Sequence, residues 1–103
     1  MAALEHFVSI KSDNKIAVLG DMLELGSKEL EEHQTIIDYV NKHNLKTIFI
    51  GAIYNKCKIV NSNLHFSNTE KLIEFITQNP IENQTILLKA SRGIKLENIV
   101  KYL

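Results

Sequence analysis

The sequence of 103 residues has one cysteine, one proline, no tryptophan and no excess of either charge. Cys57 cannot form a disulfide within the chain, and a lone thiol is typical of the reducing cytoplasm. No base partner for Cys57 is evident, so we interpret it as a bystander. Twelve Lys and Arg residues balance twelve Asp and Glu residues without a long basic run, which argues against binding to nucleic acid or to an anionic membrane.

Long apolar runs and familiar catalytic motifs are also lacking. The apolar stretches are short, as at residues 16–19, whereas a membrane helix needs about 20 apolar residues. We therefore expect no membrane segment, no export signal and a cytoplasmic location. The sequence has no G-x-x-x-x-G-K-[ST] phosphate loop, no G-x-G-x-x-G fingerprint and no G-x-S-x-G elbow. The four histidines are scattered without the spacing of a metal site, so no metal is predicted.

The remaining pattern predicts a single α/β domain over residues 1–103. Short runs rich in β-forming residues predict strands at 15–19, 47–50, 64–66 and 85–88. Most of these runs are almost uniformly apolar, which is typical of a parallel sheet covered by helices on both faces. Right-handed crossovers then give a small, open, mainly parallel sheet of Rossmann-like type.

Helical patterns lie between and around these strands. A helix is predicted over residues 28–43, with Ser27 as its cap and with an apolar face formed by Leu30, His33, Ile36, Ile37 and Val40. A capping-box spacing at 67–70 starts a second helix, which ends before Pro80. A last helix is predicted from about residue 95 to the end. The first ten residues form a helix without a cap at Met1, which indicates a helix entered from upstream and hence a piece of a larger protein.

Two loops concentrate polar groups where strands end, and ligands of open parallel sheets bind at those ends. The first loop, Gly20–Gly26, carries two carboxylates, and the second, Lys89–Gly93, carries a lysine, a serine and an arginine. Carboxylates can accept hydrogen bonds from an ammonium group, whereas the second set can hold a carboxylate or a phosphate. The alternative is that both loops are glycine turns with solvated side chains. Solubility explains Lys89 poorly, because this residue directly follows three apolar strand residues.

His33 admits two interpretations. On the apolar face of its helix, it is expected to be a core histidine with satisfied hydrogen bonds rather than a catalyst. Its place near the loop that carries Asp21 keeps a supporting role in a site open.

Specific sequence blocks point to a known family. They are residues 1–5, the block G-D-M-x-E-L-G at 20–26 with its preceding strand, Glu32-His33, and the block K-x-S-R-G-x-K-L-E at 89–97. This combination resembles the C-terminal domain of the Mur ligases, and within them the ligases that act on D-Ala-D-Ala. The resemblance spans the whole chain, although residues 52–66 add little to it. Ala90 stands where the family usually has glycine.

The resemblance implies a three-domain, ATP-dependent amide ligase of which only the third domain is present. In such enzymes ATP and Mg²⁺ phosphorylate the carboxylate of UDP-N-acetylmuramoyl-tripeptide, and the amino group of D-Ala-D-Ala attacks the acyl phosphate to give a peptidoglycan precursor. The fragment alone is expected to be inactive and to hold no catalytic residue. The implied substrate-binding residues are Asp21, Met22, Glu24, Lys89, Ser91 and Arg92. The resemblance also implies that His33 and Lys95 contact these residues rather than the substrate.

Within that site, Lys89, Ser91 and Arg92 are assigned to the dipeptide carboxylate or the γ-phosphate, and Asp21 or Glu24 to the dipeptide ammonium group. Two alternatives remain at this point. The chain can come from another Mur-type or folylpolyglutamate-type ligase, although the Met22-x-Glu24 and Ser91-Arg92 signatures favour the first assignment. It can also be a free-standing α/β module whose loops bind a small anion.

Overall fold

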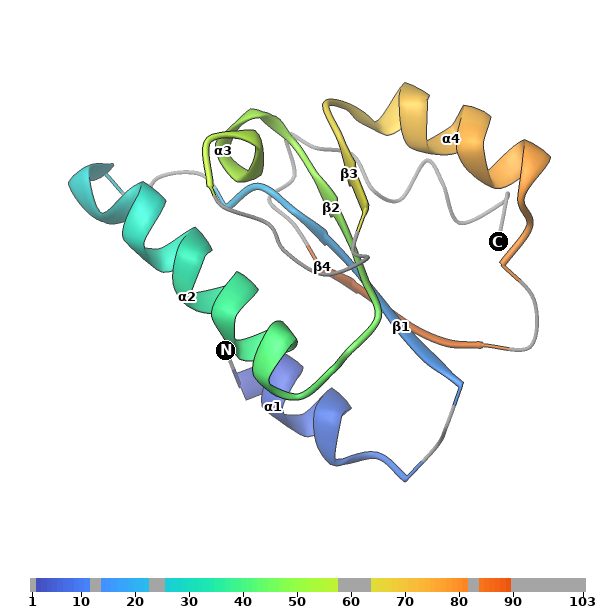
Figure 1. Cartoon of the computed structure of the whole chain (residues 1–103), viewed down its shortest axis with the longest axis horizontal. Helices are drawn as coiled ribbons and strands as arrows, with labels where there is room; N and C mark the ends of the chain where they lie inside the picture. Colours follow the sequence, from blue (N-terminus) through green and yellow to red (C-terminus); the bar gives the residue numbers. More distant parts are fainter. Residues whose placement is uncertain (1, 12–13, 23–25, 58–63, 82–83, 90–103) are drawn as a thin grey trace.

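The computed structural model describes residues 2–11, 14–22, 26–57, 64–81 and 84–89, which form an open sheet flanked by helices (Figure 1). The elements in chain order are α1 (Ala2–Ser9), β1 (Lys15–Gly20), the 3-10 turn η1 (Gly26–Lys28), α2 (Glu29–Lys42), β2 (Thr47–Ile50), α3 (Ala52–Asn55), β3 (Leu64–Phe66), α4 (Thr69–Gln78) and β4 (Thr85–Lys89). The strands lie in the order β3-β2-β1-β4, and every neighbouring pair is parallel. The predicted α/β class is therefore confirmed.

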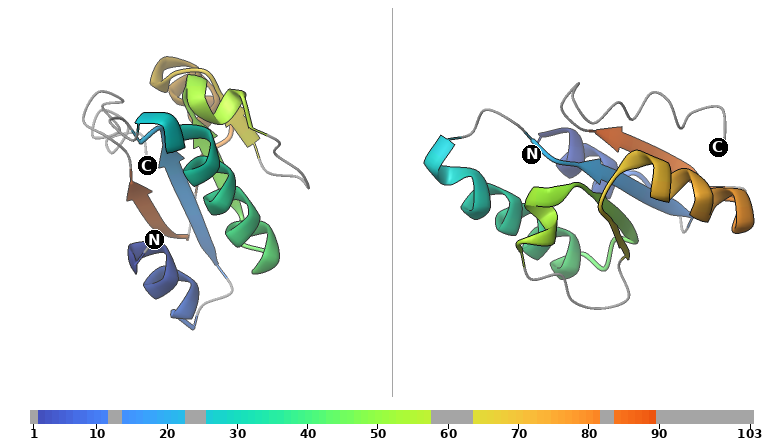
Figure 2. Two further views of the ribbon diagram at one scale, coloured as in Figure 1. Left: turned by 90° about the vertical axis from the view of Figure 1, so that its left-hand side faces the viewer. Right: turned by 90° about the horizontal axis from the view of Figure 1, so that it is seen from above.

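Helices cover both faces of the sheet (Figure 2). Each face carries its own apolar core, one shared with α1 and α2 and the other with α4. Along β1, Ala17 and Leu19 belong to the core shared with α1 and α2, whereas Ile16 and Val18 belong to the core shared with α4. Side chains alternate between the two faces of a strand, so a strand covered on both sides has to be apolar at every position. This is the physical reason that the strands could be predicted from short apolar runs.

Two details of the helix predicted over residues 28–43 were wrong. Ser27 does not cap it, because residues 26–28 form the turn η1 and α2 begins only at Glu29, without a side-chain cap. Leu30 was expected in the core and is instead 47% exposed. It lies in the first turn of α2, before the buried stripe formed by His33, Ile37 and Val40.

The helix predicted from the capping-box spacing at 67–70 is present as α4, but its cap lies one residue later. Asn68, and not Ser67, is the N-cap: its side chain accepts a hydrogen bond from the backbone N–H of Lys71 at 2.9 Å. The helix ends before Pro80, as predicted. In α1, Leu4 and Phe7 are buried in the core. The helix predicted from about residue 95 lies outside the described residues. No helix within the described ranges has both the length and the apolar character to span a membrane.

Lys15 connects α1 to the sheet, which the sequence analysis did not foresee. From the start of β1, its Nζ donates hydrogen bonds to the carbonyl oxygens of Val8 and Ile10 at 2.8 Å and of Phe7 at 3.2 Å. The last carbonyl groups of a helix have no partner within the helix and carry partial negative charge. The half-buried ammonium group therefore satisfies the end of α1 and fixes this helix against β1.

Candidate functional site

The carboxyl ends of the neighbouring strands β1 and β4 bring together the described parts of the two predicted loops. In the register of β1 and β4, Leu19 lies beside Lys89. Met22 and Lys89 line one small cavity at this end of the sheet, together with Leu4, Leu19, Gly20, Ile36 and Tyr54. This mostly apolar cavity is called the recess below. Met22 is half-buried and Lys89 is exposed, so the Lys89 ammonium group lies at the rim of the recess. Glu24, Ser91, Arg92 and Lys95 lie outside the described residues.

Asp21 is buried directly after β1, and its carboxylate accepts hydrogen bonds from the backbone of α3, the short helix after β2. Its Oδ2 accepts a hydrogen bond from the N–H of Ile53 at 3.0 Å, and its Oδ1 accepts one from the N–H of Tyr54 at 3.2 Å. These two N–H groups belong to the first turn of α3, where helical N–H groups have no partner within the helix. The carboxylate thus provides acceptors for the first N–H groups of α3. The backbone N–H of Asp21 in turn donates to the carbonyl oxygen of Ile50 at 3.0 Å.

These hydrogen bonds give Asp21 a structural role. Contact between Asp21 and a substrate ammonium group stays a prediction, but both carboxylate oxygens already have backbone partners and the residue is only 4% exposed. We therefore treat Asp21 as a residue that shapes the loop rather than one that meets the ligand.

Gly51 makes room for the Asp21 carboxylate. A Cβ at position 51 would overlap the carboxyl group of Asp21, and the backbone there has a φ of +124°, which L side chains rarely adopt. Gly51 also donates from its N–H to Phe66 at 2.9 Å, and its carbonyl lies 2.8 Å from Nε2 of His65. The ends of β1, β2 and β3 are thus joined around this glycine.

His33 joins α2 to the loop after β1. The backbone N–H of Met22 donates to its Nε2 at 3.0 Å, and its Nδ1 lies 2.7 Å from the carbonyl oxygen of Glu29. Since an N–H can only donate, Nε2 is an acceptor, and Nδ1 carries the hydrogen that it donates to Glu29. His33 is fully buried with both ring nitrogens engaged, as expected of a satisfied core histidine, and one of its partners belongs to the predicted site.

The aromatic and thiol groups behind this loop are held in their neutral forms. Tyr54 is almost fully buried, and its ring meets those of His33 at 4.6 Å and Phe49 at 4.8 Å between centroids. Burial, followed by the charges of Asp21 and Cys57, raises the pKa of the Tyr54 hydroxyl. Burial and Asp21 also raise the pKa of the Cys57 thiol, whose Sγ lies 3.5 Å from the carbonyl oxygen of Ile53. A raised pKa opposes the thiolate form that a nucleophile needs.

The described residues offer no metal site. No group of three or more His, Cys, Asp or Glu side chains in the described ranges could hold a metal ion. Asp21, which lies between the recess-lining residues Gly20 and Met22, uses both carboxylate oxygens for backbone N–H groups. The described residues therefore do not fit Mg²⁺.

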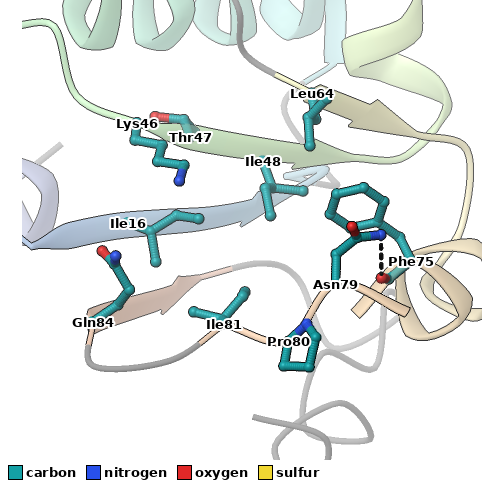
Figure 3. Close-up of a pocket in the computed structure, with 10 residues that line it drawn as sticks. All are labelled: Ile16, Lys46, Thr47, Ile48, Leu64, Phe75, Asn79, Pro80, Ile81 and Gln84. Atoms are coloured by element: carbon teal, nitrogen blue, oxygen red, sulfur yellow. Dashed lines mark hydrogen bonds between the residues drawn. The ribbon is translucent and has the colours of Figure 1, made fainter. Parts of the chain in front are cut away.

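A larger cavity of about 390 Å³ opens at the other end of the sheet, beside α4 (Figure 3). Its walls include Ile16, Ile48 and Phe75, and Lys46 extends along it. The side-chain amide of Asn79 donates to the carbonyl oxygen of Phe75 at 3.2 Å, so this polar group already has a partner. The cavity lies at the amino ends of the strands, away from the residues singled out by sequence. Its size alone does not make it the better candidate.

The chain was compared with known proteins. No model of a protein family matches it. A protein of Rickettsia prowazekii is 37% identical over 98% of the chain, one of Buchnera aphidicola from Acyrthosiphon pisum 39% over 84%, and one of Bacillus subtilis 33% over 84%. The chain spans only 24%, 20% and 21% of the lengths of these relatives, respectively.

Fold and similarity together define the class, which is that of a domain from a ligase family. Each of the three relatives is named UDP-N-acetylmuramoyl-tripeptide--D-alanyl-D-alanine ligase. The resemblance to the Mur ligases, and within them to the ligases that act on D-Ala-D-Ala, is therefore confirmed.

Proposed function

We propose that the chain is the C-terminal, amino-substrate-binding domain of an ATP-dependent ligase that joins D-Ala-D-Ala to UDP-N-acetylmuramoyl-tripeptide. Support comes from the names of the relatives and from the small share of their length, 24% in the Rickettsia protein, that the chain spans. The rest of such an enzyme would bind the UDP-sugar and ATP with Mg²⁺. The proposed product is a peptidoglycan precursor, made in the cytoplasm and needed for cell shape and division.

The proposed binding site rests on one observation, which is the recess shared by the carboxyl ends of β1 and β4. Met22 follows β1 and Lys89 ends β4, and the two residues line the same cavity although they lie far apart in the sequence. In the proposal, the Lys89 ammonium group attracts the dipeptide carboxylate or the γ-phosphate, together with Ser91 and Arg92. Glu24 accepts hydrogen bonds from the dipeptide ammonium group, while Asp21 keeps the loop in shape. No residue of this chain moves a proton in the reaction, so the chain by itself binds without catalysing.

An amide chemical-shift titration of the ¹⁵N-labelled chain tests this proposal. D-Ala-D-Ala is added in one series, ATP with Mg²⁺ in a second, and L-Ala-L-Ala in a third as the stereochemical control. We expect D-Ala-D-Ala to shift amides at 20–26 and 89–95 and L-Ala-L-Ala to shift them far less. No shift up to millimolar dipeptide would contradict independent binding by the chain, and shifts elsewhere would contradict the site.

Two lysine variants provide a matched comparison. Lys89→Met removes the ammonium group at the proposed site, whereas Lys46→Met removes an exposed ammonium group beside the cavity at the opposite end of the sheet (Figure 3). Loss of a charged hydrogen bond is expected to weaken dipeptide binding about tenfold in Lys89→Met and to leave Lys46→Met unchanged. The reverse result would place the ligand in the larger cavity.

A further inference from the structure

We propose that His33 is the positioning residue of the site: its neutral imidazole holds the backbone of Met22 and thereby fixes the loop that faces Lys89. The substrate part of this proposal rests on the proposed function, whereas the positioning part rests on geometry alone. His33 does not line the recess, and it acts through Met22, which does.

The two hydrogen bonds of the His33 ring join its own helix to Met22. Burying a polar ring is costly unless its nitrogens are paired, and both nitrogens of this fully buried ring have partners. The Nδ1 bond returns to Glu29 on the preceding turn of the same helix and so orients the ring. The Nε2 bond leaves the helix and reaches Met22. An apolar residue could fill the same space in the core, but it could not accept the N–H of Met22.

The bond between His33 and Met22 completes a closed set of contacts among α2, α3 and the residues after β1. Asp21 connects the loop to the backbone of α3 through the N–H groups of Ile53 and Tyr54. Tyr54 connects α3 to α2, because its ring meets that of His33 edge-on, with 68° between the planes. His33 then connects α2 back to the loop at Met22. Two consecutive loop residues are thus held by two different helices, and moving Met22 requires the His33 bond to break.

The contact also fixes which ring nitrogen carries the hydrogen. Nε2 accepts from the N–H of Met22, so a hydrogen on Nε2 would place one donor against another. Nδ1 then donates to the carbonyl oxygen of Glu29. The contact with Met22 therefore requires the neutral ring with its hydrogen on Nδ1.

The direct test needs no variant. In the uniformly ¹⁵N-labelled chain, a scalar coupling across the hydrogen bond should connect the amide nitrogen of Met22 with Nε2 of His33, and the ring shifts should report the hydrogen on Nδ1. Absence of the coupling at neutral pH, or a hydrogen on Nε2, would overturn the proposal.

Variants add the functional test. His33→Gln keeps an acceptor that can reach the position of Nε2, whereas His33→Leu fills the space without one. His6, which is exposed on α1, provides the matched controls His6→Gln and His6→Leu. Loss of one hydrogen bond should raise the exchange rate of the Met22 amide about tenfold in His33→Leu and weaken D-Ala-D-Ala binding by a similar factor. His33→Gln should restore both properties.

The outcomes separate the two proposals. Unchanged Met22 exchange in a folded His33→Leu variant would refute the positioning role. Normal dipeptide affinity in a variant with released Met22 would also refute it, since the loop position would then not matter. A wild-type chain that shows the Met22–His33 coupling but binds no dipeptide would contradict the proposed function and leave the positioning of the loop intact.

Discussion

Gly51→Ala should be among the most damaging single changes in the described part of the chain. Its φ of +124° lies in a region nearly reserved for glycine, where backbone strain costs about 1–3 kcal/mol. The new methyl group would also overlap the Asp21 carboxyl group and force it away from the N–H groups of Ile53 and Tyr54. Hydrogen bonds to a charged group contribute about 1.5–3 kcal/mol each. The free energy of unfolding should therefore fall by about 4 kcal/mol.

A double-mutant cycle separates the two causes. Asp21→Ala alone removes the partner of two buried N–H groups and should cost about 3 kcal/mol. In that background the overlap with the Asp21 side chain is gone, so adding Gly51→Ala should cost only the backbone strain. The double variant should then be about 2 kcal/mol more stable than the sum of the single effects predicts.

Urea unfolding followed by circular dichroism measures these values, with similar m-values expected for all variants. Gly26→Ala is the matched control, because Gly26 also has a positive φ, +61°, but nothing lies within 4 Å of the position of its Cβ. It should lose about 1 kcal/mol. The reasoning is refuted if Gly51→Ala costs no more than Gly26→Ala, or if the Asp21 and Gly51 effects simply add.

Three further predictions concern single side chains. Lys15→Met should lower the free energy of unfolding by about 1–3 kcal/mol in the same urea titration, because three carbonyl groups lose their donor. Asn68→Ala should cost about 1 kcal/mol and Asn68→Asp almost nothing, since aspartate also caps helices. Burial raises the pKa of Tyr54, so stability should be full below about pH 10 and fall above it, where the unfolded phenol ionises. Unfolding curves from about pH 8 to 11 should show a shallower fall for Tyr54→Phe, and an unchanged slope would contradict this assignment.

The strands were predictable because burial on both faces leaves a direct trace in the sequence. The runs 47–50 and 64–66 match β2 and β3 at both ends, and β1 and β4 each extend one residue further than predicted. The start of α2 was less predictable. Leu30 fits the helical spacing of the buried stripe, but periodicity does not report where a helix passes beyond its neighbours. That information lies in the tertiary structure, which leaves this leucine half exposed.

The proximity of Met22 and Lys89 was predictable, whereas the contacts around them were not. Both residues lie at the carboxyl ends of neighbouring strands, and parallel neighbours end at the same edge of the sheet. The role of Asp21 was not predictable, since its N–H partners lie 32 and 33 residues away and the contact depends on the backbone angle of Gly51. A glycine directly after a buried strand was the available signal. Burial of His33 followed from its helix face, whereas its bond to Met22 did not.

The strand order also has a consequence for how the chain folds during its synthesis. β1 is an inner strand between β2 and β4, yet β4 is the last of the described strands to leave the ribosome. Until residues 85–89 emerge, the backbone of β1 presents an unpaired edge beside the apolar side chains of Ile16 and Val18. Such edges are templates for association with other chains, and pairing between distant segments is slow. A nascent or truncated chain that ends before β4 should therefore be prone to aggregate, and the strand that carries Lys89 completes the described sheet as well as the recess.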